Sequence, residues 1–140
     1  MNDPKTAAKL VLRLSFGLSL LLVGITHYMN FEMFMAMTSE GLGPLTMLGT
    51  IWAYILPALQ IVGGALFAVG MYYKIAAWSA GVALASIPVG MLLKPVLSAA
   101  ALPDMMPAAV NAFIWLIVYA LVVKMCTCCG AGGCSTGGGE

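Results

Sequence analysis

Four long apolar runs, separated by short polar or charged segments, dominate the sequence. The runs are residues 10–29, 51–72, 75–93 and 107–125. Each has close to the roughly 20 residues that an α-helix needs to cross a bilayer core of about 30 Å. Because hydrocarbon offers the backbone no hydrogen-bond partner, we expect the runs to be helices. The pattern therefore predicts an all-α polytopic membrane protein, a bundle of four transmembrane helices.

The segments outside residues 10–125 are short. Residues 1–9 form a polar lead, and residues 126–140 form a Cys- and Gly-rich tail that we expect to be flexible. The first run follows a basic start, but it is longer than the apolar core of a signal peptide, and no small-residue cleavage site follows it. We therefore expect it to be a retained helix.

The composition agrees with a membrane protein and excludes a soluble domain and a nucleic-acid-binding protein. Charged residues make up 8% of the chain and hydrophobic residues 62%, whereas a soluble domain carries about 25% charged residues. The net charge of +1 gives no basic surface for nucleic acid. We therefore expect the lipid bilayer to surround this chain and expect no nucleic-acid partner.

The few cations predict the orientation. If the helices alternate in direction, one side of the membrane receives Lys5, Lys9, Arg13, Lys74 and Lys124. The other side receives Lys94. The positive-inside rule then predicts that both termini lie in the cytoplasm.

The connections carry their own signals. In residues 30–50, Phe31, Phe34 and Met35 favour an amphipathic segment lying in the outer interface. A tight turn at Tyr72-Tyr73-Lys74 predicts an antiparallel hairpin of the second and third runs. Pro88 is expected to bend or end the third helix. Pro107 suits the first turn of the fourth, where its missing N–H costs no hydrogen bond.

Three polar side chains within the runs are candidate ligand-binding groups: His27, Gln60 and Asn111. The imidazole of His27 suits a metal ion, a proton relay or a hydrogen bond to a quinone carbonyl. An amide in hydrocarbon is costly unless it is hydrogen-bonded. Each amide therefore binds a ligand or a neighbouring helix, and His27 is alternatively a structural residue at the membrane boundary.

Sulfur-bearing side chains form a second candidate site. The tail holds Cys126, Cys128, Cys129 and Cys134. Thiolates bind soft metal ions such as copper, but these cysteines are alternatively reduced redox-active thiols, lipidation sites or parts of a dispensable tail. Methionines just beyond His27 also suit Cu(I), although methionine is equally a filler of apolar segments.

Two groups of residues resemble signatures of the DoxX-like membrane proteins. They are Arg13-Leu-Ser-Phe-Gly17 with Gly24-Ile-Thr-His27, and Gln60-Ile-Val-Gly63-Gly64 with Gly70-Met-Tyr-Tyr-Lys74-Ile-Ala76-Ala77. The resemblance covers residues 9–125 and implies a four-helix membrane protein, some of whose relatives resemble subunits of thiosulfate:quinone oxidoreductase. The family pattern has Lys at the position of His27 and Glu at that of Gln60. The resemblance therefore implies that a potential ion pair is lost here.

These features support three functional hypotheses. Abundant packing glycines without a recognisable active site favour a small, non-catalytic accessory subunit of a larger membrane complex, and the resemblance implies a redox-linked bacterial complex. Its partners would be other membrane subunits or further copies of itself. One alternative is a quinone-interacting oxidoreductase subunit, with His27 and Gln60 donating hydrogen bonds to quinone carbonyls. The other alternative is a membrane protein that binds a soft metal ion.

Overall fold

The computed structural model describes residues 4–98 and 101–127, and every regular element in them is helical. The elements are α1 (Pro4–Met29), α2 (Phe31–Ser39), the short 3₁₀ helix η1 (Gly43–Leu45), α3 (Thr46–Val69), α4 (Tyr73–Leu97) and α5 (Leu102–Thr127). Within these residues, 4 helices are long and apolar enough to cross a membrane. The predicted all-helical class with four apolar spans is confirmed.

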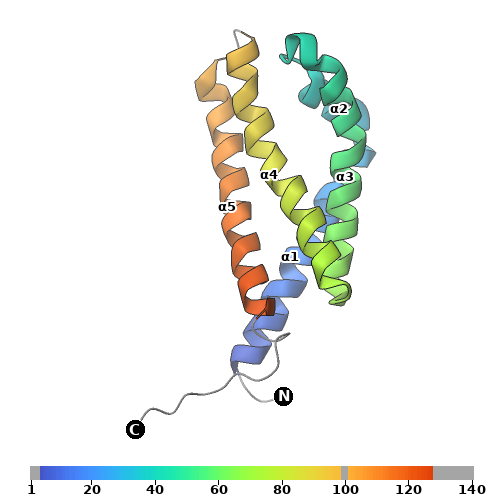
Figure 1. Cartoon of the computed structure of the whole chain (residues 1–140), viewed down its shortest axis with the longest axis vertical. Helices are drawn as coiled ribbons and strands as arrows, with labels where there is room; N and C mark the ends of the chain where they lie inside the picture. The colour runs from blue at the N-terminus through green and yellow to red at the C-terminus, as the bar shows by residue number, and fades with distance from the viewer. Residues whose placement is uncertain (1–3, 99–100, 128–140) are drawn as a thin grey trace.

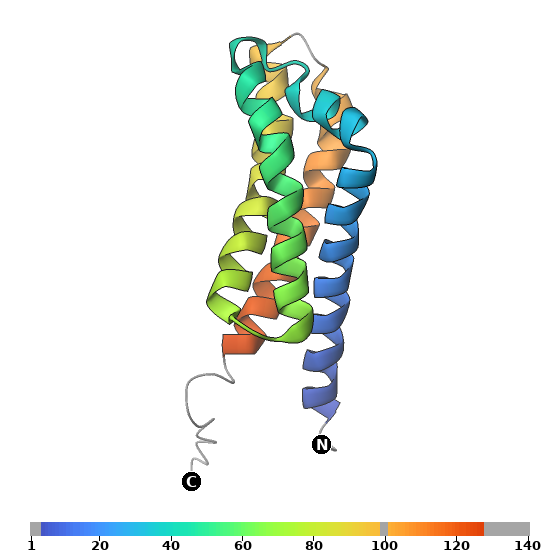
Figure 2. The same cartoon turned by 90° about the vertical axis from the view of Figure 1, so that its right-hand side faces the viewer.

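The four long helices lie side by side along the long axis of the molecule (Figures 1 and 2). α1 packs against α3, α3 against α4, and α4 against α5, while α1 also touches α5. The start of α1 and the end of α5 lie at one end, which we call proximal. The short helix α2 lies at the other end, which we call distal, and packs against α3.

The long helices extend beyond the apolar runs that predicted them. α1 begins at Pro4, inside the expected polar lead, and α3 begins at Thr46. An apolar run marks the stretch that suits hydrocarbon, whereas backbone hydrogen bonds continue a helix into the polar boundary. Helix length and hydrophobic length are therefore different quantities in this chain.

The prolines interrupt the helices less than the sequence suggested. α4 does not end at Pro88 but continues to Leu97. The expectation that Pro107 lies in a first turn was wrong, because α5 begins at Leu102 and Pro103 occupies that turn. Proline is tolerated inside membrane helices because neighbouring groups satisfy the freed carbonyl.

Glycine lets α1 and α3 approach closely. A Cβ added to Gly17 would lie 2.6 Å from the backbone nitrogen of Ala68, and one added to Gly64 would lie 2.5 Å from that of Leu21. Gly63 lies similarly against α4, 2.9 Å from the backbone nitrogen of Ala80. Small residues allow such contact between membrane helices. The backbones of α1 and α3 are therefore in direct contact at Gly17 and Gly64.

Aromatic side chains fill the rest of the proximal half. Phe16 and Phe67 meet edge to face with centroids 5.4 Å apart, and Tyr119 joins them from α5. The Tyr119 hydroxyl donates a 2.9 Å hydrogen bond to the carbonyl of Ala77 on α4. These contacts close the proximal half with side chains from every long helix.

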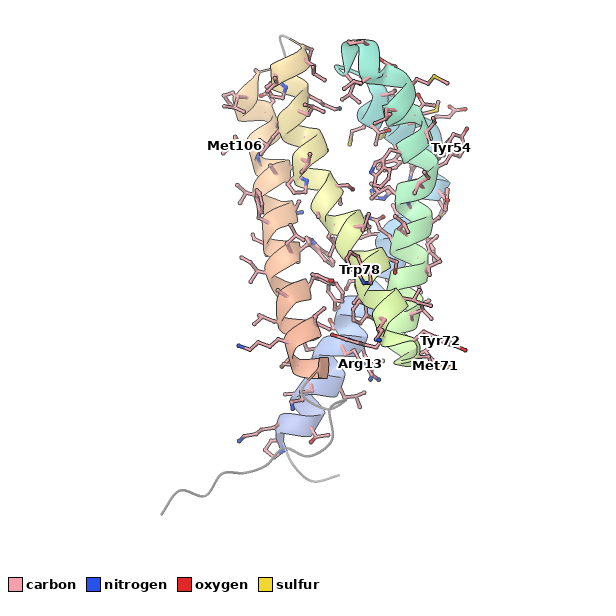
Figure 3. All side chains as sticks on the ribbon, in the orientation of Figure 1. Arg13, Tyr54, Met71, Tyr72, Trp78 and Met106 are labelled. Carbon is pink, nitrogen blue, oxygen red and sulfur yellow. The ribbon has the colours of Figure 1, made fainter. Side chains whose placement is uncertain are left out.

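The turn between α3 and α4 begins earlier than predicted. Gly70 ends α3 in the left-handed conformation, with φ of 81°, and its N–H donates to the carbonyl of Leu66. Tyr72 also has a positive φ, of 47°. A Cβ on Gly70 would lie 2.7 Å from an Nη atom of Arg13. Figure 3 shows Arg13 near Met71 and Tyr72 at the proximal end.

Candidate functional site

The distal half contains a cavity of about 530 Å³. Its walls come from all four long helices, from α2 and from η1. Most of the lining is apolar and includes Leu20, Leu56, Leu84 and Ile87. Small-molecule pockets in proteins measure about 300–1,000 Å³ and combine an apolar lining with a few polar groups. The cavity therefore has the size and the surface of a ligand site.

The three polar candidates from the spans all line this cavity. His27 reaches it from α1, Gln60 from α3 and Asn111 from α5. These residues are far apart in the sequence, so their meeting follows from the packing of the helices.

His27 and Gln60 form a direct hydrogen bond. Nδ1 of His27 lies 2.9 Å from Oε1 of Gln60, and Gln60 is only 1% exposed. An amide oxygen accepts hydrogen bonds and cannot donate them. Nδ1 therefore carries the proton, and the bond satisfies a buried acceptor that would otherwise be costly.

Phe34 fixes the plane of the imidazole. The two rings are stacked, with centroids 4.1 Å apart and an interplanar angle of 20°. Phe34 belongs to α2, so this helix contributes directly to the site. The sequence placed Phe34 in an interfacial segment, and the structure adds its contact with His27.

Nε2 of His27 has no hydrogen-bond partner among the described residues. In the same part of the chain, Arg13 Nε is the buried side-chain nitrogen or oxygen that lacks a partner. The Nε2 atom is therefore not sealed inside the protein. Because His27 lines the cavity, a molecule there can reach this side chain.

Asn111 is the polar candidate with no protein partner. Its side chain is exposed and forms no hydrogen bond within the described residues. Trp115, one turn later on α5, also lines the cavity. A carboxamide both donates and accepts, so Asn111 offers either function to a ligand.

Trp52 and Ser86 form a polar contact that the sequence did not reveal. Trp52 Nε1 donates a 3.1 Å hydrogen bond to the Ser86 hydroxyl, which donates to the carbonyl of Ala83 at 2.8 Å. Both Trp52 and Ser86 line the cavity. The sequence gave no pairing signal, because tryptophan near a span end is expected in any membrane protein.

Lys94 is the charged group of the cavity wall. It is 9% exposed, and its ammonium donates a hydrogen bond to the carbonyl of Met37 in α2. A cation near the C-terminus of a helix interacts favourably with the helix dipole. From the sequence, Lys94 was only the cation opposing the predicted orientation. In the structure it joins α4 to α2.

The candidate metal site lies largely outside the described residues. Cys128, Cys129 and Cys134 fall beyond them, and Cys126 lies in α5 without a described side chain. Within the described residues, no group of three or more His, Cys, Asp or Glu side chains is placed to hold a metal ion. The soft-metal hypothesis for the tail remains a prediction.

Comparison of the chain with protein-family models, curated proteins and solved structures finds no match.

Proposed function

We propose that this chain is an integral membrane protein that binds a lipid-soluble quinone-type molecule in the distal cavity. The observation that carries the proposal is the hydrogen-bonded His27–Gln60 pair on the wall of a largely apolar cavity of about 530 Å³. Apolar walls suit the ring and tail of such a molecule, while a few polar groups orient its oxygens. The four helices that are long and apolar enough to cross a membrane support a cavity within the bilayer, where such a ligand dissolves.

The DoxX-like resemblance supports the same site. The chain departs from that family pattern at His27 and Gln60, and these two side chains are in direct contact. A histidine and a glutamine thus occupy the place where the pattern has Lys and Glu. Membership of that family is part of the proposal.

The orientation is also part of the proposal. Lys9 and Arg13 lie at the start of α1 and Lys124 lies at the end of α5, so these cations share the proximal end. This arrangement supports a cytoplasmic proximal end, with both termini inside a bacterial inner membrane. The cavity would then lie in the outer half of the bilayer.

The packing of the glycines removes one argument for the accessory-subunit hypothesis. The glycines that suggested a partner subunit, such as Gly17, Gly63 and Gly64, pack against other helices of this chain. They account for internal packing and do not indicate a surface for another protein. Association with other subunits or further copies therefore remains a prediction.

Filling the cavity tests the proposal. Gly90 lines the cavity, and a Cβ added there meets nothing within 4 Å, so Gly90→Phe places a ring in the empty space. Ala85→Phe is the matched control, because Ala85 is an exposed residue of α4 outside the cavity lining. Both variants are made in a Trp78→Phe background, because Trp78 is 75% exposed and does not line the cavity.

The readout is quenching of the remaining Trp52 and Trp115 fluorescence by a short-chain benzoquinone in nanodiscs. We expect saturable quenching in the background protein and in Ala85→Phe, and its loss in Gly90→Phe. Quenching that does not saturate, or that is equal in all three proteins, would refute binding in the cavity.

A further inference from the structure

We infer that the distal cavity binds the hydroquinone (quinol) form of its ligand more tightly than the quinone form. The inference rests on the proposed function and adds which redox form the site prefers. It follows from which hydrogen-bond donors and acceptors of the cavity wall remain free for the ligand. A quinone ring carries two carbonyl acceptors, whereas a quinol ring carries two hydroxyl groups that both donate and accept.

The first step is the position of the proton on His27. Its Nδ1 atom donates to Gln60 Oε1 at 2.9 Å. In a neutral imidazole one nitrogen donates and the other accepts. Nε2 therefore presents a lone pair. It accepts a hydrogen bond from a quinol hydroxyl, but it repels the lone pairs of a quinone carbonyl oxygen. This reverses the donor role that the sequence suggested for His27.

The second step is the rigidity of this arrangement. Gln60 is 1% exposed, and its Cβ lies 3.1 Å from the position that a Cβ on Gly24 would occupy. The imidazole is held on its other side by stacking on Phe34. Because both partners are confined, the ligand meets a fixed acceptor and not a ring that turns to suit it.

The third step concerns the donors that would favour a carbonyl. The Trp52 indole N–H already donates to Ser86. The Lys94 ammonium donates to the Met37 carbonyl and has two further N–H groups, but a carbonyl and a hydroxyl oxygen both accept from them, so they do not distinguish the two forms. The Gln60 amide nitrogen has no hydrogen-bond partner among the described residues and Gln60 lines the cavity, so this N–H group can donate to the oxygen of either form, because carbonyl and hydroxyl oxygens both accept. Asn111 both donates and accepts, so it does not distinguish the two forms. The discriminating group is therefore the acceptor on His27.

The quinol gains one hydrogen bond to Nε2 and avoids the repulsion between Nε2 and a carbonyl oxygen. We therefore expect it to bind about ten times more tightly than the quinone, a difference of about 1.4 kcal/mol in binding free energy. For a two-electron couple, a tenfold tighter quinol raises the midpoint potential of the bound pair by about 30 mV.

The test compares three probes with the same ring on the full chain in anaerobic nanodiscs. They are a short-chain benzoquinone, its quinol, and the dimethyl ether of that quinol, which cannot donate. We expect the quinol to bind about ten times more tightly than the other two. If none of the probes binds, the proposed function fails. If the quinone or the ether binds as tightly as the quinol, only the inference fails.

A variant assigns the preference to the His27–Gln60 pair. Gln60→Met keeps the side-chain length but removes the acceptor that fixes the proton on Nδ1. We expect the affinity ratio of quinol to quinone to fall toward one. Tyr119→Phe, which removes a hydrogen bond outside the cavity lining, should keep the ratio. A tenfold ratio that persists in Gln60→Met would overturn the assignment, and the ether probe tests the inference even if this variant does not fold.

Discussion

The proximal and distal halves are built from the same helices but packed in different ways. In the proximal half, Gly17 and Gly64 bring α1 and α3 into backbone contact, and Phe16, Phe67 and Tyr119 fill the remaining space. In the distal half, α4 and α5 diverge from α3 (Figure 1), and a cavity of about 530 Å³ lies between the helices.

The difference shows how one small membrane protein combines rigidity with a binding site. Close contact between the helices leaves no room for a ligand in the proximal half. Where the helices surround the cavity, polar groups such as His27 and Gln60 must satisfy each other. The polar atoms that this hydrogen bond does not use are the ones that a ligand can contact.

The largest expected effect comes from adding one methyl group to each half. Gly64→Ala places a Cβ 2.5 Å from the backbone nitrogen of Leu21, whereas Gly90→Ala places one where nothing lies within 4 Å. We expect Gly64→Ala to destabilise the protein by about 2–3 kcal/mol. Gly90→Ala should change stability by less than about 1 kcal/mol. Unfolding titrations in SDS measure both, and equal stabilities would contradict the contrast between the halves.

Lys94→Met tests how the distal end is held. The substitution removes the ammonium that donates to the Met37 carbonyl, and we expect a loss of about 2 kcal/mol, as for hydrogen bonds of charged groups. Hydrogen exchange should show faster opening of α2 amides, while amides of α1 near Gly17 stay protected. Lys124→Met, at an exposed position of α5, is the control and should change neither. Unchanged exchange in α2 would show that Lys94 does not hold this helix.

The smallest expected effects come from two substitutions, each of which removes one side-chain hydrogen bond from one half. Tyr119→Phe removes the bond to Ala77, and Trp52→Phe removes the bond to Ser86. Each should cost about 0.6 kcal/mol, the average for such bonds between membrane helices. Only Trp52→Phe alters the cavity wall, so only it should change quinone affinity in equilibrium binding. A comparable change in Tyr119→Phe would mean that the two halves are coupled.

The helices could be predicted from the sequence, but their ends and proline positions could not. Hydrocarbon leaves the backbone no choice other than internal hydrogen bonds, so long apolar runs identify helices reliably. The ends depend on contacts outside hydrocarbon. α4 continues past Pro88, and Pro107 lies inside α5, because neighbouring helices accommodate both.

Three members of the candidate site could be predicted from the sequence, but its other members and the contacts among them could not. His27, Gln60 and Asn111 stand out because polar groups are rare in apolar spans. Lys94 and Ser86 do not stand out, since a lysine near a span end and a serine in a helix are ordinary. The partners Met37 and Trp52 come from other helices, so no local pattern reveals the contacts.

The sequence by itself determined that this chain is helical, that four of its helices suit a membrane, and which polar residues are unusual there. These properties are local, since each depends on the energy of placing a residue or a backbone group in hydrocarbon. Only the tertiary structure decided that His27 meets Gln60, that Phe34 stacks on the imidazole, and that the proton lies on Nδ1. The direction of a hydrogen bond depends on the partner that packing supplies.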